Sequence, residues 1–518
     1  MTLSLEQIQS IAASPYIPPN GDPYSRIAKI HKYWSRKPWS VIDQLLDNYT
    51  KPDDVVLDPF CGSGVIGLQA IRAGRNFEGS DLNPFAIRLT RETIKGEFNS
   101  YSFQLALEGL RLQVMDTIND LYKIDGDLVL YSIPSKSDLP GYNAVILKAD
   151  STKAVKTLVK LEDLPKVNFK AEDDPLLPDQ YFPKKFYKDR FSYKGVEKVS
   201  QLFSERNLLA LSRLYHAIDQ LDAELKSHFE LCLTNTLLHV SKLKSEKVRP
   251  LGVNNYWIPD DFIEENVWWR FEDRCKQFQI AKETITKALQ TTSPQDRKEP
   301  NITIADATNL MHLPDNSVDY ILTDPPYGDA IQYSELSLIW NCWIRQLYET
   351  ENEIIINPEQ SKDSQTYASM LEKFLIEASR VLKLDCPMTI SFHSKDISLW
   401  CELAASLYAC GFELENLFTS HGVGSPFTKN WASFSPKSDI YITIRNRRFK
   451  DRTTEVTPGL EFLQSLGEFA NDNLDSGQQI YDFFVLASVN EIMKGFRLTG
   501  LHKKTMASIV ERFQKLHE

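Results

Sequence analysis

The four consecutive residues Asp324, Pro325, Pro326 and Tyr327 bring together a carboxylate, two rigid rings and an aromatic side chain. Each proline fixes its own φ, and Pro325 also excludes Asp324 from the helical region, so the loop is rigid. Asp324 and the carbonyl of Pro325 can then accept both hydrogens of a planar exocyclic amine. The ring of Tyr327 offers a face on which a flat base can stack. This combination predicts chemistry on the amine of a nucleobase.

The residues before this loop predict a β-strand that ends at Asp324. Residues 318–323 alternate and are rich in β-forming residues, and a turn cluster precedes them at 314–317. In open α/β sheets, ligands bind at the carboxyl ends of the strands. The sequence therefore predicts that Asp324 lies at the ligand-binding edge of a sheet, and a Pro-Pro turn without chemistry is the alternative interpretation.

A second strand-turn-helix pattern occupies residues 55–68. Its glycines, Gly62, Gly64 and Gly67, satisfy the dinucleotide-binding pattern, and Asp81 follows at the distance expected of a ribose-binding acid. A nicotinamide-dependent oxidoreductase is therefore one hypothesis for the function.

The residues just before the glycine turn favour S-adenosyl-L-methionine over a dinucleotide. Asp58 and Phe60 place a carboxylate and a bulky ring where a pyrophosphate would bind, and no later segment resembles a hydride-transfer site. The methionyl end of S-adenosyl-L-methionine carries an ammonium and a sulfonium, which Asp58 can attract. Asp81 is suited to the ribose hydroxyls. Asp306, in a strand and acidic turn at 301–307, is suited to the adenine amine.

Both motifs resemble those of the amino-group nucleic-acid methyltransferases. Residues 324–327 are similar to the catalytic motif, which has the form Asp-Pro-Pro-Tyr most often in adenine-N6 enzymes, and 58–64 are similar to the cofactor motif of DNA methyltransferases. His31 followed by Lys37 and Pro38 resembles the segment that precedes that cofactor motif, at a wider spacing. The resemblance implies the cofactor S-adenosyl-L-methionine. The candidate cofactor-binding residues are His31, Lys37, Asp58, Pro59, Phe60, Cys61, Gly62, Gly64, Asp81, Leu82, Asn83, Asp306 and Ala307.

Two further segments, 203–208 and 329–337, resemble a bacterial group of adenine-specific DNA methylases related to restriction and defence loci. The order of cofactor motif, intervening region and catalytic motif is that of one class of these enzymes. In that class the intervening region recognises the target DNA. The resemblance therefore implies that the middle of this chain selects the target sequence.

The net charge of −11 argues against a protein that coats nucleic acid by bulk electrostatics. Contact with nucleic acid must then be local. The strongest candidate is a run in which cations alternate with aromatic residues, and a solvated basic loop is the alternative interpretation. The candidate nucleic-acid-binding residues are Lys184, Lys185, Lys188 and Arg190.

The cysteines and the hydrophobic pattern bear on the compartment. Seven cysteines show no paired metal-ligand spacing, so we expect a reducing compartment and no metal site. The apolar runs are broken by charges, and the N-terminus has no basic-apolar signal. We therefore expect a soluble, cytoplasmic protein with no membrane contact.

The 518 residues, 42% of them apolar, have room for two to four domains. We predict an α/β fold: a Rossmann-like methyltransferase sheet with a large inserted target-recognition region and a small C-terminal helical module. Residues 1–27 read as an irregular lead-in, and the C-terminal module as a docking or dimerisation unit. The predicted domains are 1–95 with the cofactor motifs, 96–300 as the inserted region, 301–450 with the catalytic motif, and 451–518 as the helical module.

These observations lead to one hypothesis and several alternatives. The hypothesis is a sequence-specific methyltransferase that acts on the N6 amine of adenine in double-stranded DNA, flips the base out of the helix, and belongs to a restriction or phage-defence system. A restriction nuclease or another defence subunit would be its partner. Cytosine-N4 DNA and guanine-N2 RNA methyltransferases are the nearest alternatives, because their substrate amines are similar. An idle nucleic-acid-binding subunit and the oxidoreductase are more distant.

Overall fold

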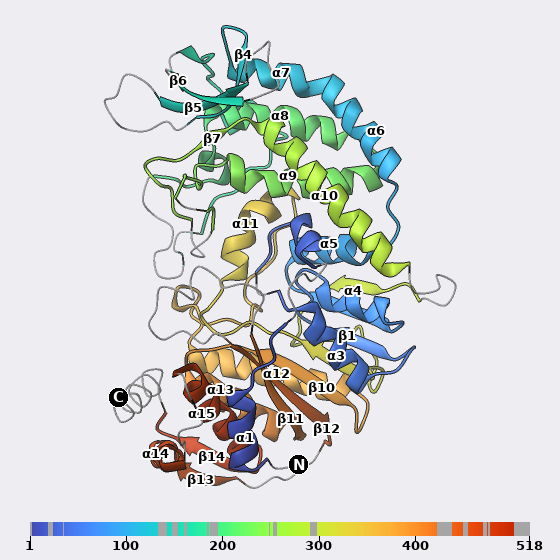
Figure 1. The fold of residues 1–518 in the computed structure, drawn as a ribbon, viewed down its shortest axis with the longest axis vertical. Helices are drawn as coiled ribbons and strands as arrows, with labels where there is room; N and C mark the ends of the chain where they lie inside the picture. The colour runs from blue at the N-terminus through green and yellow to red at the C-terminus, as the bar shows by residue number, and fades with distance from the viewer. Residues whose placement is uncertain are drawn as a thin grey trace.

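The computed structural model shows an elongated molecule with a large β-sheet toward one end and a mainly helical region at the other (Figure 1). No helix of the described residues is long and apolar enough to cross a membrane. The structure describes residues 3–18, 24–34, 36–132, 142–147, 154–159, 163–183, 186, 195–247, 249–251, 256–290, 298–421, 438–448, 454–469, 474 and 477–501.

Seven strands form the large sheet in the order β11-β12-β10-β9-β1-β2-β8. Neighbouring strands are parallel except at β12, which pairs antiparallel with both β10 and β11. The carboxyl ends of β8, β2, β1, β9 and β10 therefore share one edge. The strands are β11 (Phe412–His421), β12 (Ser438–Asn446), β10 (Pro387–Phe392), β9 (Tyr320–Thr323), β1 (Val55–Asp58), β2 (Asn76–Asp81) and β8 (Asn301–Ile304).

The strand order distinguishes this sheet from a dinucleotide-binding one. Numbered in chain order, its strands follow 3-2-1-4-5-7-6. The doubly wound dinucleotide fold has the order 3-2-1-4-5-6. The extra antiparallel strand between the fifth and sixth positions argues against the oxidoreductase. The predicted Rossmann-like methyltransferase sheet is confirmed.

Successive residues of each central strand point to opposite faces of the sheet, and both faces are buried. Val56 packs in one hydrophobic core and Leu57 in the other, and neither is exposed. One face is covered by α3 (Trp39–Tyr49), α4 (Val65–Arg72) and α5 (Pro84–Ile94). The other is covered by α12 (Ser364–Val381), α13 (Ile397–Ala409) and α15 (Gly477–Ile492).

The inserted region combines helices with a small antiparallel sheet. The sheet consists of β3 (Lys123–Ile124), β4 (Asp127–Ser132), β5 (Tyr142–Leu147), β6 (Ala154–Val159) and β7 (Glu264–Glu265). The helices are α6 (Ser100–Leu110), α7 (Asp116–Asn119), α8 (Glu205–Asp219), α9 (Ala223–Val240) and α10 (Val267–Leu289).

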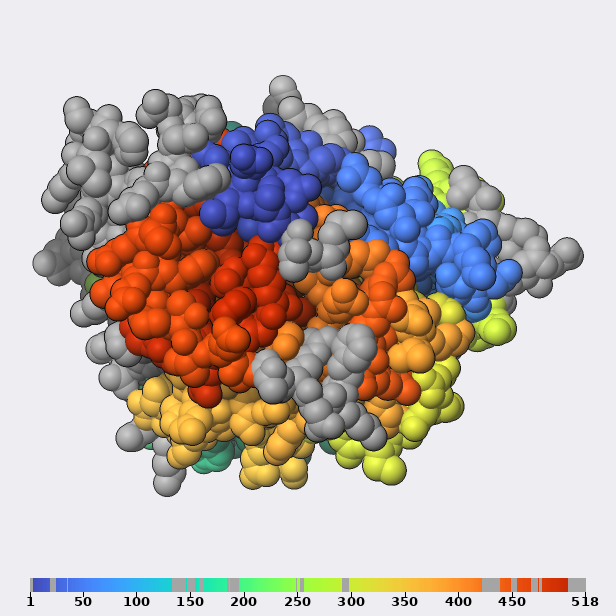
Figure 2. All heavy atoms as spheres, turned by 90° about the horizontal axis from the view of Figure 1, so that it is seen from below, coloured from blue at the N-terminus to red at the C-terminus, as the bar shows by residue number. Residues whose placement is uncertain are grey.

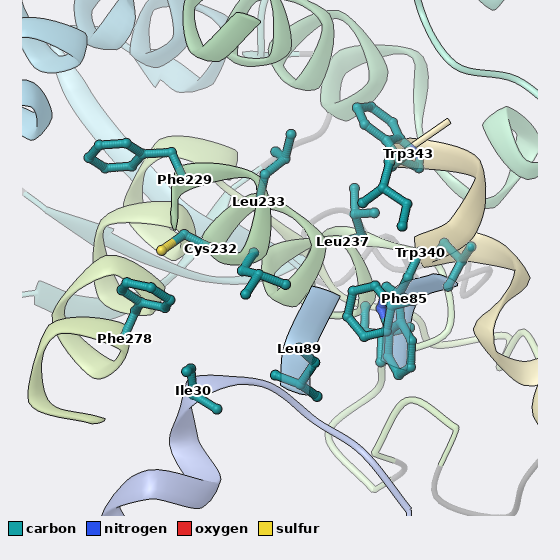
Figure 3. Close-up of a cluster of buried hydrophobic side chains, with 14 of the residues drawn as sticks. Ile30, Phe85, Leu89, Phe229, Cys232, Leu233, Leu237, Phe278, Trp340 and Trp343 are labelled. Carbon is teal, nitrogen blue, oxygen red and sulfur yellow. The ribbon is translucent and has the colours of Figure 1, made fainter. Parts of the chain in front are cut away.

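The inserted region shares a hydrophobic core with the methyltransferase fold. Phe85 on α5, Leu237 on α9, Phe278 on α10 and Trp340 on α11 (Tyr333–Trp343) belong to one cluster of buried side chains (Figure 3). The two parts are therefore packed together and not joined by flexible linkers alone.

A buried lysine also fastens the insertion to the sheet domain. Lys282 on α10 donates hydrogen bonds to the carbonyls of Glu92 (2.7 Å) and Lys95 (3.0 Å), at the C-terminal end of α5. A cation is favourable there because the last carbonyls of a helix lack partners and carry partial negative charge. The carboxylate of Glu92 lies 3.4 Å from the same ammonium and 3.0 Å from Nδ1 of His228 on α9.

The N-terminal segment is helical where an irregular lead-in was predicted. Helix α1 (Leu5–Ala13) begins at a capping box, in which Ser4 accepts from the Gln7 amide and the Gln7 side chain accepts from the Ser4 amide. The prediction was wrong for these residues, although the Ser4 to Gln7 spacing carries the signal. Two short helical pieces, α2 (Tyr24–Ile27) and residues 28–30, lead on to the sheet domain.

The described part of the C-terminal region packs as a layer of the sheet domain, and the predicted docking or dimerisation role of this region stays a prediction. Phe483, Phe484 and Val485 on α15 are fully buried, and Asn490 exchanges hydrogen bonds with the backbone of Leu3 (3.1 and 3.2 Å). N-terminal and C-terminal residues therefore lie side by side on one face (Figure 2). The remaining elements there are β13 (Glu455–Pro458), α14 (Gly459–Phe469) and β14 (Phe496–Thr499).

Candidate active site

The chain turns sharply between β1 and α4 at two glycines. The φ angle is +50° at Gly62 and +77° at Gly64, which other residues rarely adopt. A Cβ atom at Gly64 would lie 2.9 Å from the Cα atom of Thr90, and one at Gly62 would lie 3.0 Å from the ring of Tyr33. Glycine is thus favoured at both positions by the backbone conformation and by the close packing of Thr90 and Tyr33.

Two carboxylates flank this turn at the ends of β1 and β2. Asp58 accepts hydrogen bonds from the Thr323 hydroxyl (2.8 Å) and from a nearby amide (3.2 Å), and Asp81 accepts from the amides of Gly62 (3.0 Å) and Asn83 (2.9 Å). Burial raises the pKa of Asp58 to about 8 and that of Asp81 to about 6 in spite of these hydrogen bonds. A cationic ligand would favour the ionised form of both, so the pair is suited to bind one.

Asn83 and Asp306 follow β2 and β8, and their hydrogen-bond partners differ. Asn83 caps α5 and is joined to α11, since it donates to Ser337 (3.1 Å) and accepts from Asn341 (2.9 Å). Asp306, after β8, accepts from the amide and hydroxyl of Thr308, both at 2.8 Å. Both residues line the same pocket as Asp58 and Asp81, so the strand ends converge as predicted from their sequence positions.

The loop at residues 324–327 follows β9 directly and is held from several sides. The hydroxyl of Tyr367 on α12 donates to the carbonyl of Pro326 (2.8 Å). Gly328 ends the loop with φ at +60°, where an added Cβ would meet a side chain of α13 at 2.8 Å. Asp324 lines the pocket. The loop is therefore fixed by neighbours in addition to its own prolines.

Tyr327 is placed differently from the sequence-based expectation of an open stacking face. Its ring is only 9% exposed and packs edge-on against Phe392, with ring centroids 5.2 Å apart. Its hydroxyl donates to Oδ1 of Asp324 and accepts from Nζ of Lys37 (2.7 Å). The hydroxyl thus bonds to both Lys37 and Asp324, and the Lys37 ammonium also lies over the ring, 5.3 Å from its centroid.

Lys37 lies beside the carboxylate of Asp324. Its Nζ atom is 3.2 Å from Oδ1 of Asp324 and 3.1 Å from Oδ2 of Asp439 on β12. Burial opposes its charge, but the two carboxylates raise the pKa of Lys37 well above its usual value. Burial likewise raises the pKa of Asp324 to about 6, against the charge of Lys37 and the hydrogen bond from Tyr327. The resemblance implied a cofactor contact for Lys37, which lines the pocket but makes its polar contacts with these side chains.

One pocket brings most of the predicted residues together. Gly64, Pro325 and Tyr327 do not line it, and neither does His31. The ring of His31 packs between aromatic rings of α5 and α11 at 4.7 and 4.9 Å, and burial lowers its pKa to about 3. It is therefore a core residue and is not placed to contact a cofactor. The predicted residues that line the pocket are Lys37, Asp58, Pro59, Phe60, Cys61, Gly62, Asp81, Leu82, Asn83, Asp306, Ala307, Asp324 and Pro326.

Sequence reasoning missed nearly half of the pocket wall. These residues come from α3 and the segment before it, from the turn into α4 and its first residues, and from the chain at and after α11. Ser63 and Tyr333 lie within segments that carry the resemblance but were not chosen as site residues. For the others, the nearest signal was the resemblance around Lys37. The additional lining residues are Tyr33, Trp34, Arg36, Ile42, Ser63, Val65, Ile66, Tyr333, Tyr348, Asn352, Glu353 and Ile354.

Comparison with known proteins finds similarity in the segment that carries the glycine turn. A family model described as DNA methylase matches residues 13–92. The protein resembles the DNA methylases in this segment. Over 66 residues it is 35% identical to Type II methyltransferase M2.DpnII of Streptococcus pneumoniae, which covers 13% of this chain and 25% of that protein. Over 57 residues it is 40% identical to M.XycI of Xanthomonas campestris pv. cyanopsidis, covering 11% and 19%.

The chain therefore spans a quarter or less of the length of these curated relatives. Two solved structures also align. A protein described as a DNA modification methylase from Thermus thermophilus aligns with a TM-score of 0.19 and 15% identity, over 41% of this chain and 92% of that one. The rRNA methyltransferase aviRa from Streptomyces viridochromogenes aligns with a TM-score of 0.27 and 10% identity, over 82% and 92%. These scores are too low to support an argument about this chain.

Proposed function

We propose that this protein is a DNA methyltransferase that transfers a methyl group from S-adenosyl-L-methionine to the exocyclic N6 amine of adenine. The observation that carries the proposal is the meeting of both motifs in one pocket. Asp58 ends β1, Asp324 follows the adjacent strand β9, and the Thr323 hydroxyl joins the two by its hydrogen bond to Asp58. A cofactor at the first motif and an amine at the second would thus be neighbours.

The residues around the glycine turn fit S-adenosyl-L-methionine. Asp58 is buried and short of positive charge, so it would hold the cationic methionyl end. Gly62 lines the same pocket, so its backbone would lie near that end. Asp81 would bind the ribose hydroxyls and Asp306 the adenine amine. The cofactor would supply an electrophilic methyl group at the sulfonium.

At the catalytic loop, the chain's own groups would orient the target amine. The lone pair of an adenine amine is delocalised into the ring, so the amine is a poor nucleophile. Asp324 and the Pro325 carbonyl would accept its two hydrogens and direct the lone pair toward the methyl group. This is a positioning and electrostatic effect. As the new N–C bond forms and the S–C bond breaks, the amine gains positive charge and loses one proton, which Asp324 is placed to accept.

The target base must leave the duplex to reach a buried carboxylate, at a cost of a few kcal/mol. We propose that the inserted region binds the double-stranded DNA around it. The predicted phosphate-binding residues lie outside the described residues, so their role stays a prediction. They are Lys184, Lys185, Lys188 and Arg190.

The setting is a proposal as well. The relatives M2.DpnII and M.XycI are Type II methyltransferases, which supports a place in a cytoplasmic restriction-modification or phage-defence system. A restriction nuclease would then be the partner. The predicted oligomer through the C-terminal region is less favoured, because α15 is already buried within the sheet domain.

Methyl transfer from tritiated S-adenosyl-L-methionine tests the proposal. The protein is incubated separately with double-stranded DNA and with RNA, and the labelled nucleosides are identified after digestion. We expect label in N6-methyladenine from DNA. Label in N4-methylcytosine would move the target to cytosine, and label in RNA alone would replace DNA as the substrate. No label in either would overturn the proposal.

A further inference from the structure

Lys37 joins three groups that are far apart in the chain. Its ammonium lies within 3.2 Å of Tyr327, Asp324 and Asp439, although Tyr327 is 290 and Asp439 is 402 residues further along. The lysine comes from the extended segment just before α3, where Pro38 precedes the first helical residue. This segment runs across the ends of the central strands, so one side chain reaches two of them.

Both donors to Asp324 meet the same oxygen. The Tyr327 hydroxyl and the Lys37 ammonium contact Oδ1, and within the described part of the chain no contact to Oδ2 is found. A carboxylate held at one oxygen by two donors has a fixed orientation. Oδ2 is then the oxygen that is left for an incoming amine.

The antiparallel strand supplies the residue that anchors Lys37. Because β12 runs opposite to β10, its first residues lie beside the carboxyl end of β10, with Ile440 opposite Phe392. Asp439 therefore reaches the ligand-binding edge from a strand that begins there. Its Oδ2 atom contacts Lys37 and its Oδ1 atom lies 3.3 Å from Nδ1 of His393.

We propose that Lys37 and Asp439 are positioning residues of the methyl-transfer site: Lys37 fixes one oxygen of Asp324 so that the other faces the target amine, and Asp439 holds Lys37 in place. The inference rests on the proposed function. It assigns Lys37 to the catalytic loop, where the sequence resemblance implied a cofactor contact. It also gives β12 a part in the site, which no motif indicates.

The charges around Asp324 predict a change in the pH dependence of activity that a merely destabilising substitution would not cause. The groups that face it are Lys37, Tyr327, Asp439 and Asp58, with Tyr441 beside Lys37 and His393 beside Asp439. Removing the charge of Lys37 leaves burial and Asp439 to raise the pKa of Asp324 further. Removing the charge of Asp439 has the opposite effect, since it deletes a like charge and leaves Lys37 to Asp324 alone. The two variants should therefore shift the acidic limb of the pH–rate profile in opposite directions.

Single-turnover methyl transfer as a function of pH, at saturating cofactor and DNA, tests this pair. In Lys37→Met we expect a lower plateau rate and an acidic limb displaced upward by about one to three pH units. In Asp439→Asn the limb should move to lower pH. Lys37→Arg keeps the charge and should keep the limb near its wild-type position. The cofactor Kd, measured by calorimetry, should change little in all three.

The outcomes distinguish failure of the positioning role from failure of the proposed function. An active wild-type protein whose limb stays fixed in both variants, or moves the same way in both, would overturn the positioning role alone. If Lys37→Met does not fold, the downward shift in Asp439→Asn and the retained limb in Lys37→Arg decide the question. A wild-type protein that transfers no methyl group to DNA or RNA overturns the proposed function first, and the inference with it.

Discussion

Lys37 and Lys282 are both buried lysines beside carboxylates, but they lie in different regions. Lys282 is fully buried between α10 and α5, and it donates to two backbone carbonyls in addition to its contact with Glu92. The ammonium of Lys37 instead contacts only side chains in the contacts described, and it lines the pocket. The first lysine closes a helix end, whereas the second faces groups that a substrate can also contact.

The pKa values of the carboxylates beside the two lysines differ as well. Burial would raise the pKa of Glu92, but the neighbouring His228 and Lys282 lower it to about 2. Burial raises the pKa of Asp324 to about 6 even with Lys37 beside it. A carboxylate whose partners fully compensate its charge is a structural group. One whose charge is only partly compensated in a pocket is available to a ligand, as is common at functional sites.

The largest expected effect is on the methyl-transfer rate, when the carboxylate beside Lys37 is removed. Asp324→Ala should lower the methyl-transfer rate by about 10²–10³-fold or more, because it removes the acceptor of the target amine. Its cofactor affinity should stay near normal, since in the proposed mechanism Asp324 contacts the amine and not the methionyl end. Calorimetry with Asp81→Ala as the control separates the two roles. An equal loss of cofactor affinity in both variants would count against the assignment.

The next effect concerns Lys282 and is one of stability. Lys282→Met leaves Glu92 buried without its cation, so we expect a loss of about 3–5 kcal/mol in denaturant unfolding, with the rate per folded molecule unchanged. Lys276→Met on the same helix is the matched control, because that lysine is exposed and its change should stay within about 0.5 kcal/mol. Equal stability of the two variants would mean that Lys282 does not fasten the insertion.

A smaller loss is expected for Tyr327→Phe. Its hydroxyl donates to a charged carboxylate, a hydrogen bond of about 1.5–3 kcal/mol, so the rate should fall about 10- to 100-fold. A tyrosine used only as a stacking face would lose almost nothing. Tyr367→Phe removes a bond to a neutral carbonyl and should cost less. Rates for Tyr327→Phe equal to wild type would restore the stacking role.

The smallest effect is a pH dependence of cofactor binding. With its pKa at about 8, Asp58 is mostly protonated at neutral pH in the free protein, and a cationic ligand favours its ionised form. Affinity for S-adenosyl-L-methionine should therefore rise by up to about tenfold per pH unit below pH 8 and level off above it, with proton release on binding. Calorimetry in buffers of different ionisation enthalpy measures this release. Asp58→Asn should bind weakly and without that pH dependence.

Much of the fold could be predicted from residues that are close together in the chain. The strand ending at Asp58, the turn at Gly62 and Gly64 and the acid at Asp81 are set by residues close together in the chain, so the pattern alone predicted them. The alternation before Asp324 placed the catalytic loop at a strand end in the same way. Helix α1 was missed although its capping box lies in the sequence, because the prolines and glycine that follow it dominated the interpretation.

The C-terminal region could not be placed by the same means. Its apolar residues predict helices, but the same pattern suits a separate module or a layer on the sheet. Burial of Phe483 and Phe484 against the sheet domain is a long-range choice that local periodicity does not encode.

The sequence by itself determined the strand ends and turns on which the proposed chemistry rests, because these depend on neighbours along the chain. The tertiary structure decided which side chains meet that chemistry. It removed His31 into the core, turned the hydroxyl of Tyr327 onto Asp324, and brought Lys37 and Asp439 to the same carboxylate. The physical reason is that these contacts depend on the order and direction of strands in the sheet, and above all on the antiparallel β12, which no local pattern specifies.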